Sequence, residues 1–384
     1  MVARETVLLC VNRTCLEVAE AAAAAGDVLM DTDAVSKAAA ALPPPAEVAG
    51  ACRFLRLPIR FQAEQEVNAM ALFHLLDFGS GFDSLLLAKS GRDAAEAVQY
   101  GLLGMLLHGA PVDSRHWMEA FSGEQVFQFF GIDATEDEPV AGLPGVMLSR
   151  QGPLGAFTGK LKETMNEGGR ALAAAGQPSL GALVLSHLDG QVAAGQPPSA
   201  AALVEALAEA VPSFDDRGMY RGTQVYLYRK AQALAQQLHL RFRGSDDRFK
   251  FVDTAQLAAD SGNVLPSILR RQGVLKLSDS LAAAVDGGQD LQGDEREVAL
   301  RAAAVAACAA ICRAAAVAGG DGEPAIEPWQ LSMFLLRQEE QCTQRLRQGQ
   351  GQAQDQQAEG EGAGATAGAQ EASARHVACG TTAY

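Results

Sequence analysis

The chain has 384 residues, of which 48% are hydrophobic and 20% charged, so we expect a sizeable buried core and exclude a wholly disordered protein. Lys and Arg number 31 against 46 Asp and Glu, and this net charge of −15 argues against a protein that wraps duplex DNA or RNA. No apolar run approaches the roughly 20 residues that span a bilayer, and the N-terminus lacks the pattern of a secretory signal. We therefore expect a cytoplasmic protein with no membrane partner.

The cysteines and histidines do not form a metal-binding pattern. Seven cysteines are spread along the chain without a CxxC pair, and the six histidines never fall at HxxxH spacing. Cys308 and Cys312 are one helical turn apart, a spacing more typical of small apolar residues inside a helix. We expect neither a metal site nor a disulfide framework.

The apolar spacing predicts helices along most of the chain. Helical periodicity marks residues 18–25 and 35–42 and returns at 64–76, where the stretch closes on a Phe- and Gly-rich turn. Strand-like alternation is scarce, and its best case, 225–228, leads straight into another helical stretch. Ala is abundant and aromatic residues make up only 6%, so we expect a mostly α fold with a few short strands.

The chain divides into three parts by composition. Residues 1–345 can form a single helical domain. From residue 348 to 374 no side chain is more apolar than Ala, Gly or Thr, so we predict a disordered low-complexity insertion at 346–374. Residues 375–384 end in an aromatic side chain, and we expect this segment to dock back onto the helical domain.

Polar residues gather around two predicted helix entrances in the third quarter of the chain. Arg229, Lys230 and Gln232 stand at the head of one predicted helix. Asp260 lies in a polar turn just before another helix, which has Pro266 near its first position. A carboxylate in such a turn is either a helix cap or a general base, and the residues alone favour a cap.

A second cluster lies on the helix predicted from 294 to 319. Glu297 and Arg301 share a face of this helix with Val305, Cys308 and Cys312. Both charged side chains are therefore expected to point toward the core. They are either an i,i+4 ion pair at the edge of a buried face or an Arg kept partly desolvated to meet an anionic ligand. The residues alone favour the ion pair.

In this order, the motifs of the chain resemble the queuosine salvage family, the queuosine 5′-phosphate N-glycosylase/hydrolases. Each motif is weak by itself, and the specificity comes from their order and spacing over nearly the whole chain. The matching segments are Leu76-Asp77-Phe78-Gly79-Ser80-Gly81-Phe82, Tyr220-Arg221-Gly222, Tyr228-Arg229-Lys230-Ala231-Gln232, Val264-Leu265-Pro266-Ser267-Ile268-Leu269, Gly293-Asp294 with Glu297 and Arg301, and Thr381-Thr382-Ala383-Tyr384.

The resemblance implies a mostly α fold related to DNA glycosylases and hydrolysis of the N-glycosidic bond of queuosine 5′-monophosphate. The product would be queuine, a 7-deazaguanine base reused in tRNA modification, and neither a metal nor an organic cofactor is implied. The family has its catalytic Asp four residues before the proline of the Leu-Pro motif. Counted directly back from Pro266, that position is Gly262. If Ser261 and Gly262 are a two-residue insertion in the turn, Asp260 aligns with the catalytic Asp instead, and we favour this alignment.

The resemblance also implies a set of substrate-binding residues. Because a 7-deazapurine has carbon at position 7, departure of the base must be aided by hydrogen bonds elsewhere on it, and Asp77 or Gln232 could supply them. The 5′-phosphate needs cations, and the candidates are Arg229, Lys230 and Arg301. Phe78, Phe82, Glu297 and Tyr384 complete the set.

Two other functions remain open from the sequence. One is a noncatalytic relative that binds a queuosine nucleotide or serves as a helical interaction module. If Asp260 lines one cavity with Lys230 and Arg301, the enzyme is favoured; if Asp260 only caps a surface helix, the binding protein is favoured. The other, a DNA glycosylase, would need a basic face that a net charge of −15 hardly permits.

Overall fold

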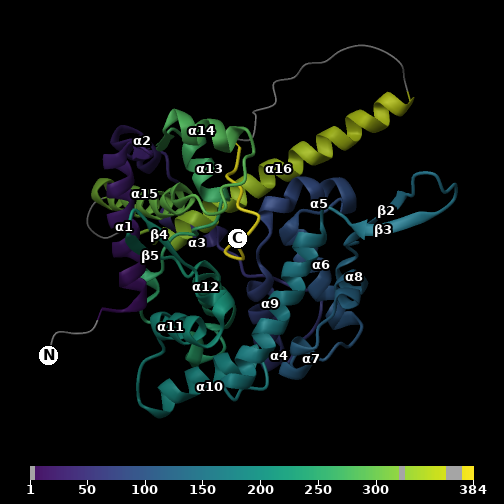
Figure 1. Ribbon diagram of the computed structural model, residues 1–384. Helices are drawn as coiled ribbons and strands as arrows, with labels where there is room; N and C mark the ends of the chain where they lie inside the picture. Colours follow the sequence, from purple (N-terminus) through teal and green to yellow (C-terminus); the bar gives the residue numbers. More distant parts are fainter. Residues whose placement is uncertain (1–4, 320–324, 360–373) are drawn as a thin grey trace.

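The computed structural model describes residues 5–319, 325–359 and 374–384, without the side chains of 319 and 348–359. Figure 1 shows a mostly helical molecule, and the predicted fold class, mostly α with a few short strands, is confirmed. The α-helices are α1 (Val7–Ala25), α2 (Thr32–Ala40), α3 (Pro45–Ala51), α4 (Ala63–Leu76), α5 (Asp83–Ser90), α6 (Ala94–Leu107), α7 (Arg115–Glu119), α8 (Gly123–Phe130), α9 (Gly155–Ala174), α10 (Leu180–Ala193), α11 (Ala200–Ala210), α12 (Arg229–Phe242), α13 (Val264–Arg271), α14 (Asp279–Asp286), α15 (Glu295–Gly319) and α16 (Pro328–Glu359).

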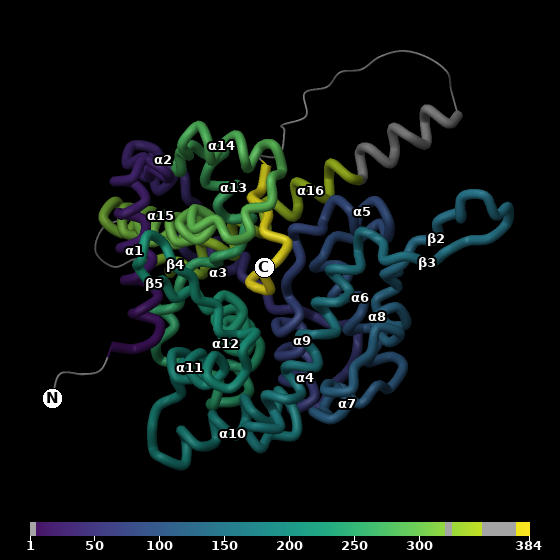
Figure 2. Tube along the Cα trace, in the orientation of Figure 1, coloured from purple at the N-terminus to yellow at the C-terminus, as the bar shows by residue number. Residues whose placement is uncertain are grey.

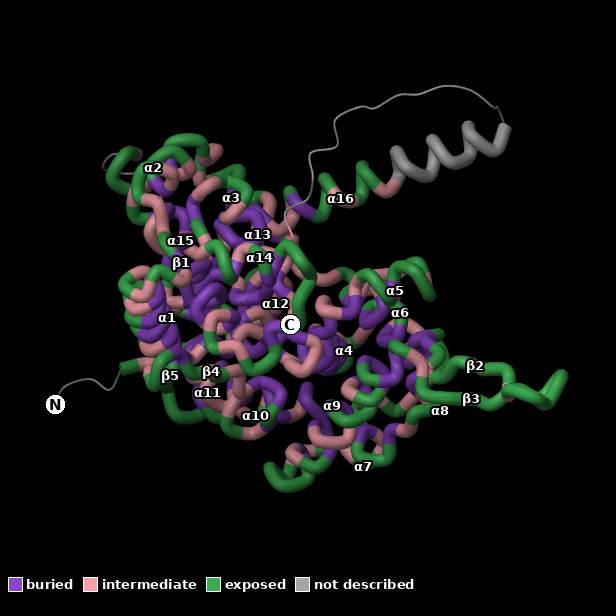
Figure 3. Tube along the Cα trace, turned by 45° about the horizontal axis from the view of Figure 1, so that its top comes forward, coloured by how far each residue is buried: buried purple, intermediate pink, exposed green. Residues whose placement is uncertain are grey.

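The strands are short and pair in antiparallel twos. They are β1 (Val28–Met30), β2 (Thr135–Pro139), β3 (Met147–Gln151), β4 (Arg217–Tyr220), β5 (Thr223–Tyr226) and β6 (Leu275–Leu277). Strand β1 pairs with β6, which ties the N-terminal region to the residues after α13. Strands β2 and β3 form a hairpin whose strand residues are all exposed and which projects from the body of the molecule (Figure 3).

The strand expected at 225–228 is displaced by two residues, because β5 ends at Tyr226 and α12 begins at Arg229. Its partner β4 precedes it across a two-residue turn, Arg221-Gly222, in which both residues have positive φ angles. Two successive positive φ angles are characteristic of the tight hairpin turn that matches the twist of the strands.

Helix α15 is the central helix of one group of elements. It packs against α1, α2, α13 and α16, whereas α4, α6, α8 and α9 lie on the other side of the molecule, and α12 contacts both α4 and α11 (Figure 1). The expectation that no stretch is apolar enough to span a bilayer is wrong for residues 295–318, which meet that test by length and composition. However, 67% of the most apolar 18 residues of this stretch are buried inside the protein, as in the core helix of a globular domain.

The last described residues, 374–384, run between the two sides of the molecule (Figure 2). On one side the backbone N–H of Leu291 donates to Val377 O, and on the other that of Gly79 donates to Tyr384 O (2.7 and 2.8 Å). In the stretch predicted as a disordered insertion, 346–374, helix α16 continues to Glu359, and 360–373 lie outside the described residues. The three-part division of the chain therefore stays a prediction.

Candidate functional site

Asp260 lies in the turn that leads into α13. Its Oδ1 accepts a hydrogen bond from the backbone N–H of Gly262 (2.7 Å), and its own N–H donates to Ser332 Oγ on α16 (3.1 Å). Helix α13 has Asn263 at its N-cap and no side-chain cap, so the prediction that Asp260 caps this helix is wrong. The turn is fixed at both ends, which leaves Oδ2 of Asp260 to meet another group.

That group is Arg229, the first residue of α12. Its Nε donates to Asp260 Oδ2 (3.0 Å), and its Nη2 lies 3.2 Å from Oδ2 of Asp77, at the end of α4. Burial works to lower the pKa of Arg229, but the two carboxylates outweigh it and raise the pKa, so the guanidinium stays charged. Two carboxylates from distant segments are thus fixed on either side of one cation.

The backbone before Arg229 is strained. Tyr228, the N-cap of α12, has φ 46° and ψ 38°, in the left-handed region that side chains other than glycine seldom adopt. Such conformations cost free energy and tend to persist at functional sites. Here the strained residue directly precedes Arg229.

A cavity of about 410 Å³ lies between the end of α3, the end of α4, α12 and α16. Asp260, Asp77 and Arg229 lie on its wall together, whereas Lys230 and Arg301 are not among its lining residues. The lining residues are Ala51, Arg53, His74, Asp77, Arg229, Ala233, Gln236, Gln237, Asp260, Ser332, Met333, Leu336, Arg337 and Glu340.

His74 is a member of this cavity wall that the sequence analysis missed. Its side chain is 4% exposed, and neither ring nitrogen has a hydrogen-bond partner among the described residues. Burial lowers its pKa to about 4, so the ring is neutral near pH 7. In the sequence it stands within the apolar run of α4, where a histidine is usually a core residue, and no local pattern marks it as different.

Lys230 points into the core on the other side of the α12 entrance. It is fully buried, and its Nζ donates to the backbone carbonyl of Leu75 (3.0 Å). Burial lowers its pKa to about 7. Nζ lies 5.4 Å from the ring centre of Phe78, and both Phe78 and Phe82 are buried against Phe157, at ring-centre distances of 6.2 and 5.6 Å.

Gln232 is engaged by the backbone at both ends of its amide. Its Nε2 donates to Leu227 O (2.7 Å) and its Oε1 accepts from the N–H of Ala258 (2.9 Å). The side chain therefore joins the start of α12 to the segment that leads to Asp260. Because both ends are occupied and the residue does not line the cavity, its geometry is that of a structural bridge.

Arg301, on α15, contacts the backbone of the turn that contains Asp260. Its Nε donates to the backbone carbonyl of Ser261 (2.6 Å), and its two terminal nitrogens lie 3.3 and 2.5 Å from the two carboxylate oxygens of Asp216. The expected partner Glu297 is farther, at 3.7 Å from Nε. The side chains of Arg301 and Asp216 are only 4% and 6% exposed, so this is a buried ion pair.

Asp216 was missed by the sequence analysis because it lies outside every predicted helix. Besides pairing with Arg301, its backbone carbonyl accepts from the N–H groups of Leu227 and Tyr228 (both 3.0 Å). The same residue thus ties the entrance of α12 to the helix that carries Arg301.

The C-terminal segment closes this buried cluster. Tyr384 is 3% exposed, with Arg301 5.2 Å from its ring centre and the ring of His376 at 5.4 Å in an edge-to-face contact. His376 Nε2 lies 3.6 Å from Glu297 Oε1. Burial works to raise the pKa of Glu297, but Arg301, His376 and Tyr384 outweigh it, and the pKa is lowered.

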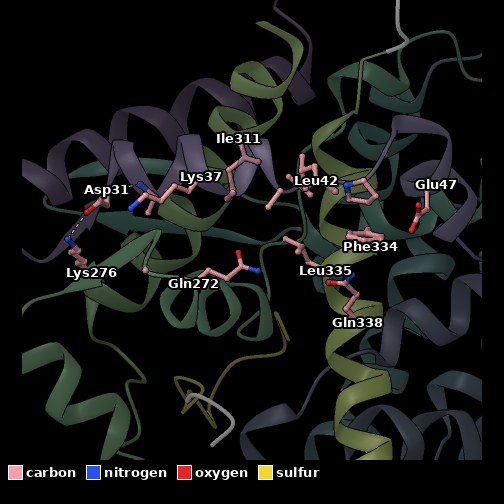
Figure 4. Close-up of a pocket in the computed structure, with 16 residues that line it drawn as sticks. Asp31, Lys37, Leu42, Glu47, Gln272, Lys276, Ile311, Phe334, Leu335 and Gln338 are labelled. Carbon is pink, nitrogen blue, oxygen red and sulfur yellow. Dashed lines mark hydrogen bonds and ion pairs between the residues drawn. The ribbon is translucent and has the colours of Figure 1, made fainter. Parts of the chain in front are cut away.

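A larger cavity, of about 820 Å³, lies elsewhere, between α2, α13, α15 and α16 (Figure 4). Apolar residues such as Ile311 and Phe334 form part of its wall, and the Asp31–Lys276 ion pair lies at one end. It contains none of the residues predicted for the site. Among the described residues, no group of three or more His, Cys, Asp or Glu side chains is arranged to hold a metal ion.

Comparison with known proteins gives two matches. The family model described as queuosine salvage protein matches residues 163–354. A relative from Sphaerobacter thermophilus, named queuosine 5′-phosphate N-glycosylase/hydrolase, is 34% identical over 148 residues, which is 38% of this chain and 44% of the relative. The matched part therefore spans less than half of the relative's length. The family match takes in Arg229, Asp260 and Arg301 but not Asp77 or Tyr384.

Proposed function

This chain belongs to the queuosine salvage protein family, and from that membership we propose that it hydrolyses the N-glycosidic bond of queuosine 5′-monophosphate and releases queuine for tRNA queuosine salvage. The name of the Sphaerobacter thermophilus relative supports the reaction and the substrate. The observation that carries the proposal is the cavity wall on which Asp260 and Asp77 flank the partly buried Arg229 (3.0 and 3.2 Å).

Asp260 is the catalytic carboxylate in this proposal. When the bond between the anomeric carbon and the base nitrogen breaks, its electron pair leaves with the base and the sugar becomes oxocarbenium-like. A carboxylate beside the anomeric carbon stabilises that positive charge and orients the water that adds to it. Arg229 and the N–H of Gly262 fix the two oxygens of Asp260, so the carboxylate does not need to reorganise during the reaction.

Asp77 is proposed to bind the base. Queuine has a cationic secondary amine and several N–H groups. A carboxylate can form an ion pair with the amine and accept hydrogen bonds from the N–H groups. Asp77 faces the same cavity as Asp260, which supports this role. The neutral His74 lies on the same wall with unpartnered nitrogens and could bond the base or the water.

The other predicted residues are proposed to act through this pair. Arg301, with Glu297 and Tyr384 around it, positions the turn of Asp260 through its bond to Ser261 O. Lys230, Gln232, Phe78 and Phe82 hold the α12 entrance and the end of α4 in place, and they are positioning residues.

The noncatalytic alternative is less well supported. Asp260 does not cap a surface helix but lines a cavity. Neither Lys230 nor Arg301 lines that cavity with it, and Arg301 instead contacts the backbone of the Asp260 turn. A cytoplasmic location, no membrane partner and no direct contact with duplex nucleic acid also belong to the proposal. The burial of most of α15 and the net charge of −15 support the last two.

The test is queuine release from queuosine 5′-monophosphate, followed by liquid chromatography and mass spectrometry. We expect release by the wild type and a loss of about 10²–10⁴-fold in kcat for Asp260→Asn, which keeps the shape but removes the charge. The matched control is Asp247→Asn, an exposed carboxylate that pairs only with Lys250 among the described residues. Undiminished release by Asp260→Asn would move the catalytic role to another residue, and binding without release would favour the noncatalytic protein.

A further inference from the structure

The cavity that contains Asp260 has a second wall, formed by the end of α3 and by α16. Three charged residues lie on it: Arg53, Arg337 and Glu340. We propose that Arg53 and Arg337 bind the 5′-phosphate of the nucleotide, an inference that rests on the proposed function and adds the part of the site that selects a phosphorylated substrate.

The cations expected to bind the phosphate have other partners. Arg229 is held between Asp260 and Asp77, and Arg301 is paired with Asp216. Lys230 is fully buried and donates to a backbone carbonyl in the core. An Arg whose charge is already balanced by a carboxylate has little attraction left for a phosphate, so the anion needs another site.

Arg53 and Arg337 have only backbone acceptors as hydrogen-bond partners among the described residues. Arg337 Nη1 donates to Ala51 O (2.7 Å), and Arg53 Nη1 donates to the carbonyls of Gly50 (2.5 Å) and Cys52 (3.3 Å). These acceptors are uncharged, and within the part of the chain that the structure describes neither guanidinium forms an ion pair. A guanidinium has five N–H donors, so each has several left for an anion.

The charges that line the cavity divide between its two walls. Arg229 lies with Asp77 and Asp260 on one wall, whereas Arg53 and Arg337 lie on the other with Glu340. In a chain with a net charge of −15, these two arginines are not part of a generally basic surface. Glu340 lies on the same wall but is exposed and accepts from Gln344.

The spacing along α16 fits a ribose 5-phosphate. Ser332 Oγ binds the backbone N–H of Asp260, and Arg337 follows five residues later, about 7.5 Å along the helix axis. Ser332, Met333, Leu336, Arg337 and Glu340 all line the cavity, so this face of the helix connects the carboxylate to the cation. The volume of about 410 Å³ is also in the range for a ligand site, about 300–1,000 Å³.

The experiment compares queuosine 5′-monophosphate with the nucleoside queuosine in Arg53→Met, Arg337→Met and the double variant. We expect each single variant to raise KM for the nucleotide about 10–100-fold, with little change in kcat or in kcat/KM for the nucleoside. The matched control is Arg56→Met, which removes the same charge from the same loop but from a residue outside this cavity. Arg53→Lys should recover part of the loss.

Calorimetric binding of ribose 5-phosphate separates this inference from the proposed reaction. If the arginine variants lose ribose 5-phosphate binding while Asp260→Asn retains it, the phosphate site stands whether or not the wild type releases queuine. If the variants bind ribose 5-phosphate and the nucleotide as the wild type does, or if the wild type binds neither, the assignment of Arg53 and Arg337 is wrong. Thermal melts of each variant exclude loss of folding as the cause.

Discussion

Arg301→Met tests whether the buried ion pair supports the catalytic turn. The substitution keeps an unbranched side chain of similar length but leaves the Asp216 carboxylate, 6% exposed, without its cation. Removing one partner of a buried pair costs about 3–5 kcal/mol, because the other charge stays in a poorly solvating environment. With an unfolding entropy of about 2.1 cal/mol/K per residue, that corresponds to about 4–6 °C in Tm for 384 residues.

Urea unfolding followed by circular dichroism measures the free energy of unfolding, and queuine release measures the function. The variant is also expected to lose activity at temperatures where it is fully folded, because Arg301 Nε no longer holds Ser261 O. Adding Asp216→Asn should recover part of the stability, since the buried carboxylate of Asp216 is then no longer left without its cation. The control is Arg270→Met at the more exposed Arg270–Asp286 pair, expected to cost less than about 1 kcal/mol. An Arg301→Met cost no larger than that of Arg270→Met would refute the reasoning.

Three further predictions follow from the buried polar residues. The pKa of Lys230 is about 7 in the folded protein and higher in the unfolded protein, so between about pH 7 and 10 the unfolded state binds more protons. The free energy of unfolding of the wild type should therefore rise from about pH 7 to 10. Urea titrations across this range should show that Lys230→Met removes the rise. Burial also lowers the pKa of His74 in the folded protein, to about 4, so the free energy of unfolding of the wild type should fall as the pH falls from about 6.5 to 4. In acid unfolding, His74→Phe should make the free energy of unfolding less dependent on pH in this range. Gln232→Leu should lower the free energy of unfolding by about 1–3 kcal/mol but leave KM for the nucleotide unchanged. A raised KM under conditions in which the variant is fully folded would instead make Gln232 a substrate ligand.

Local patterns predicted the helices well, because apolar periodicity and helix formers act within a few residues of one another. The same patterns placed Glu297 and Arg301 on the core side of one helix. They did not identify the main partner of Arg301, because Asp216 lies 85 residues earlier and only the packing of α15 on β4 brings the two together. A buried ion pair between distant segments has no local signature.

The candidate site shows the same division. The order of motifs selected Asp77, Arg229 and Asp260, which the fold gathers from three distant segments onto one cavity wall. Arg53 and His74 stayed unrecognised for opposite reasons. Arg53 belongs to an irregular stretch with no periodicity, and His74 is hidden in an apolar helix where its unpartnered nitrogens appear only in three dimensions.

The make-up of the cavity wall has a consequence for how the protein is made. The wall needs both Ala51 and Glu340, so it cannot form on a nascent chain until α16 has left the ribosome as far as Glu340. At about 5–20 residues per second, the segment around Ala51 waits some 15–60 s for its partner. Helical contacts form far faster than this. The pace of translation therefore sets when the nucleotide site first exists, and until then Asp77 and Arg53 are available to chaperones instead of substrate.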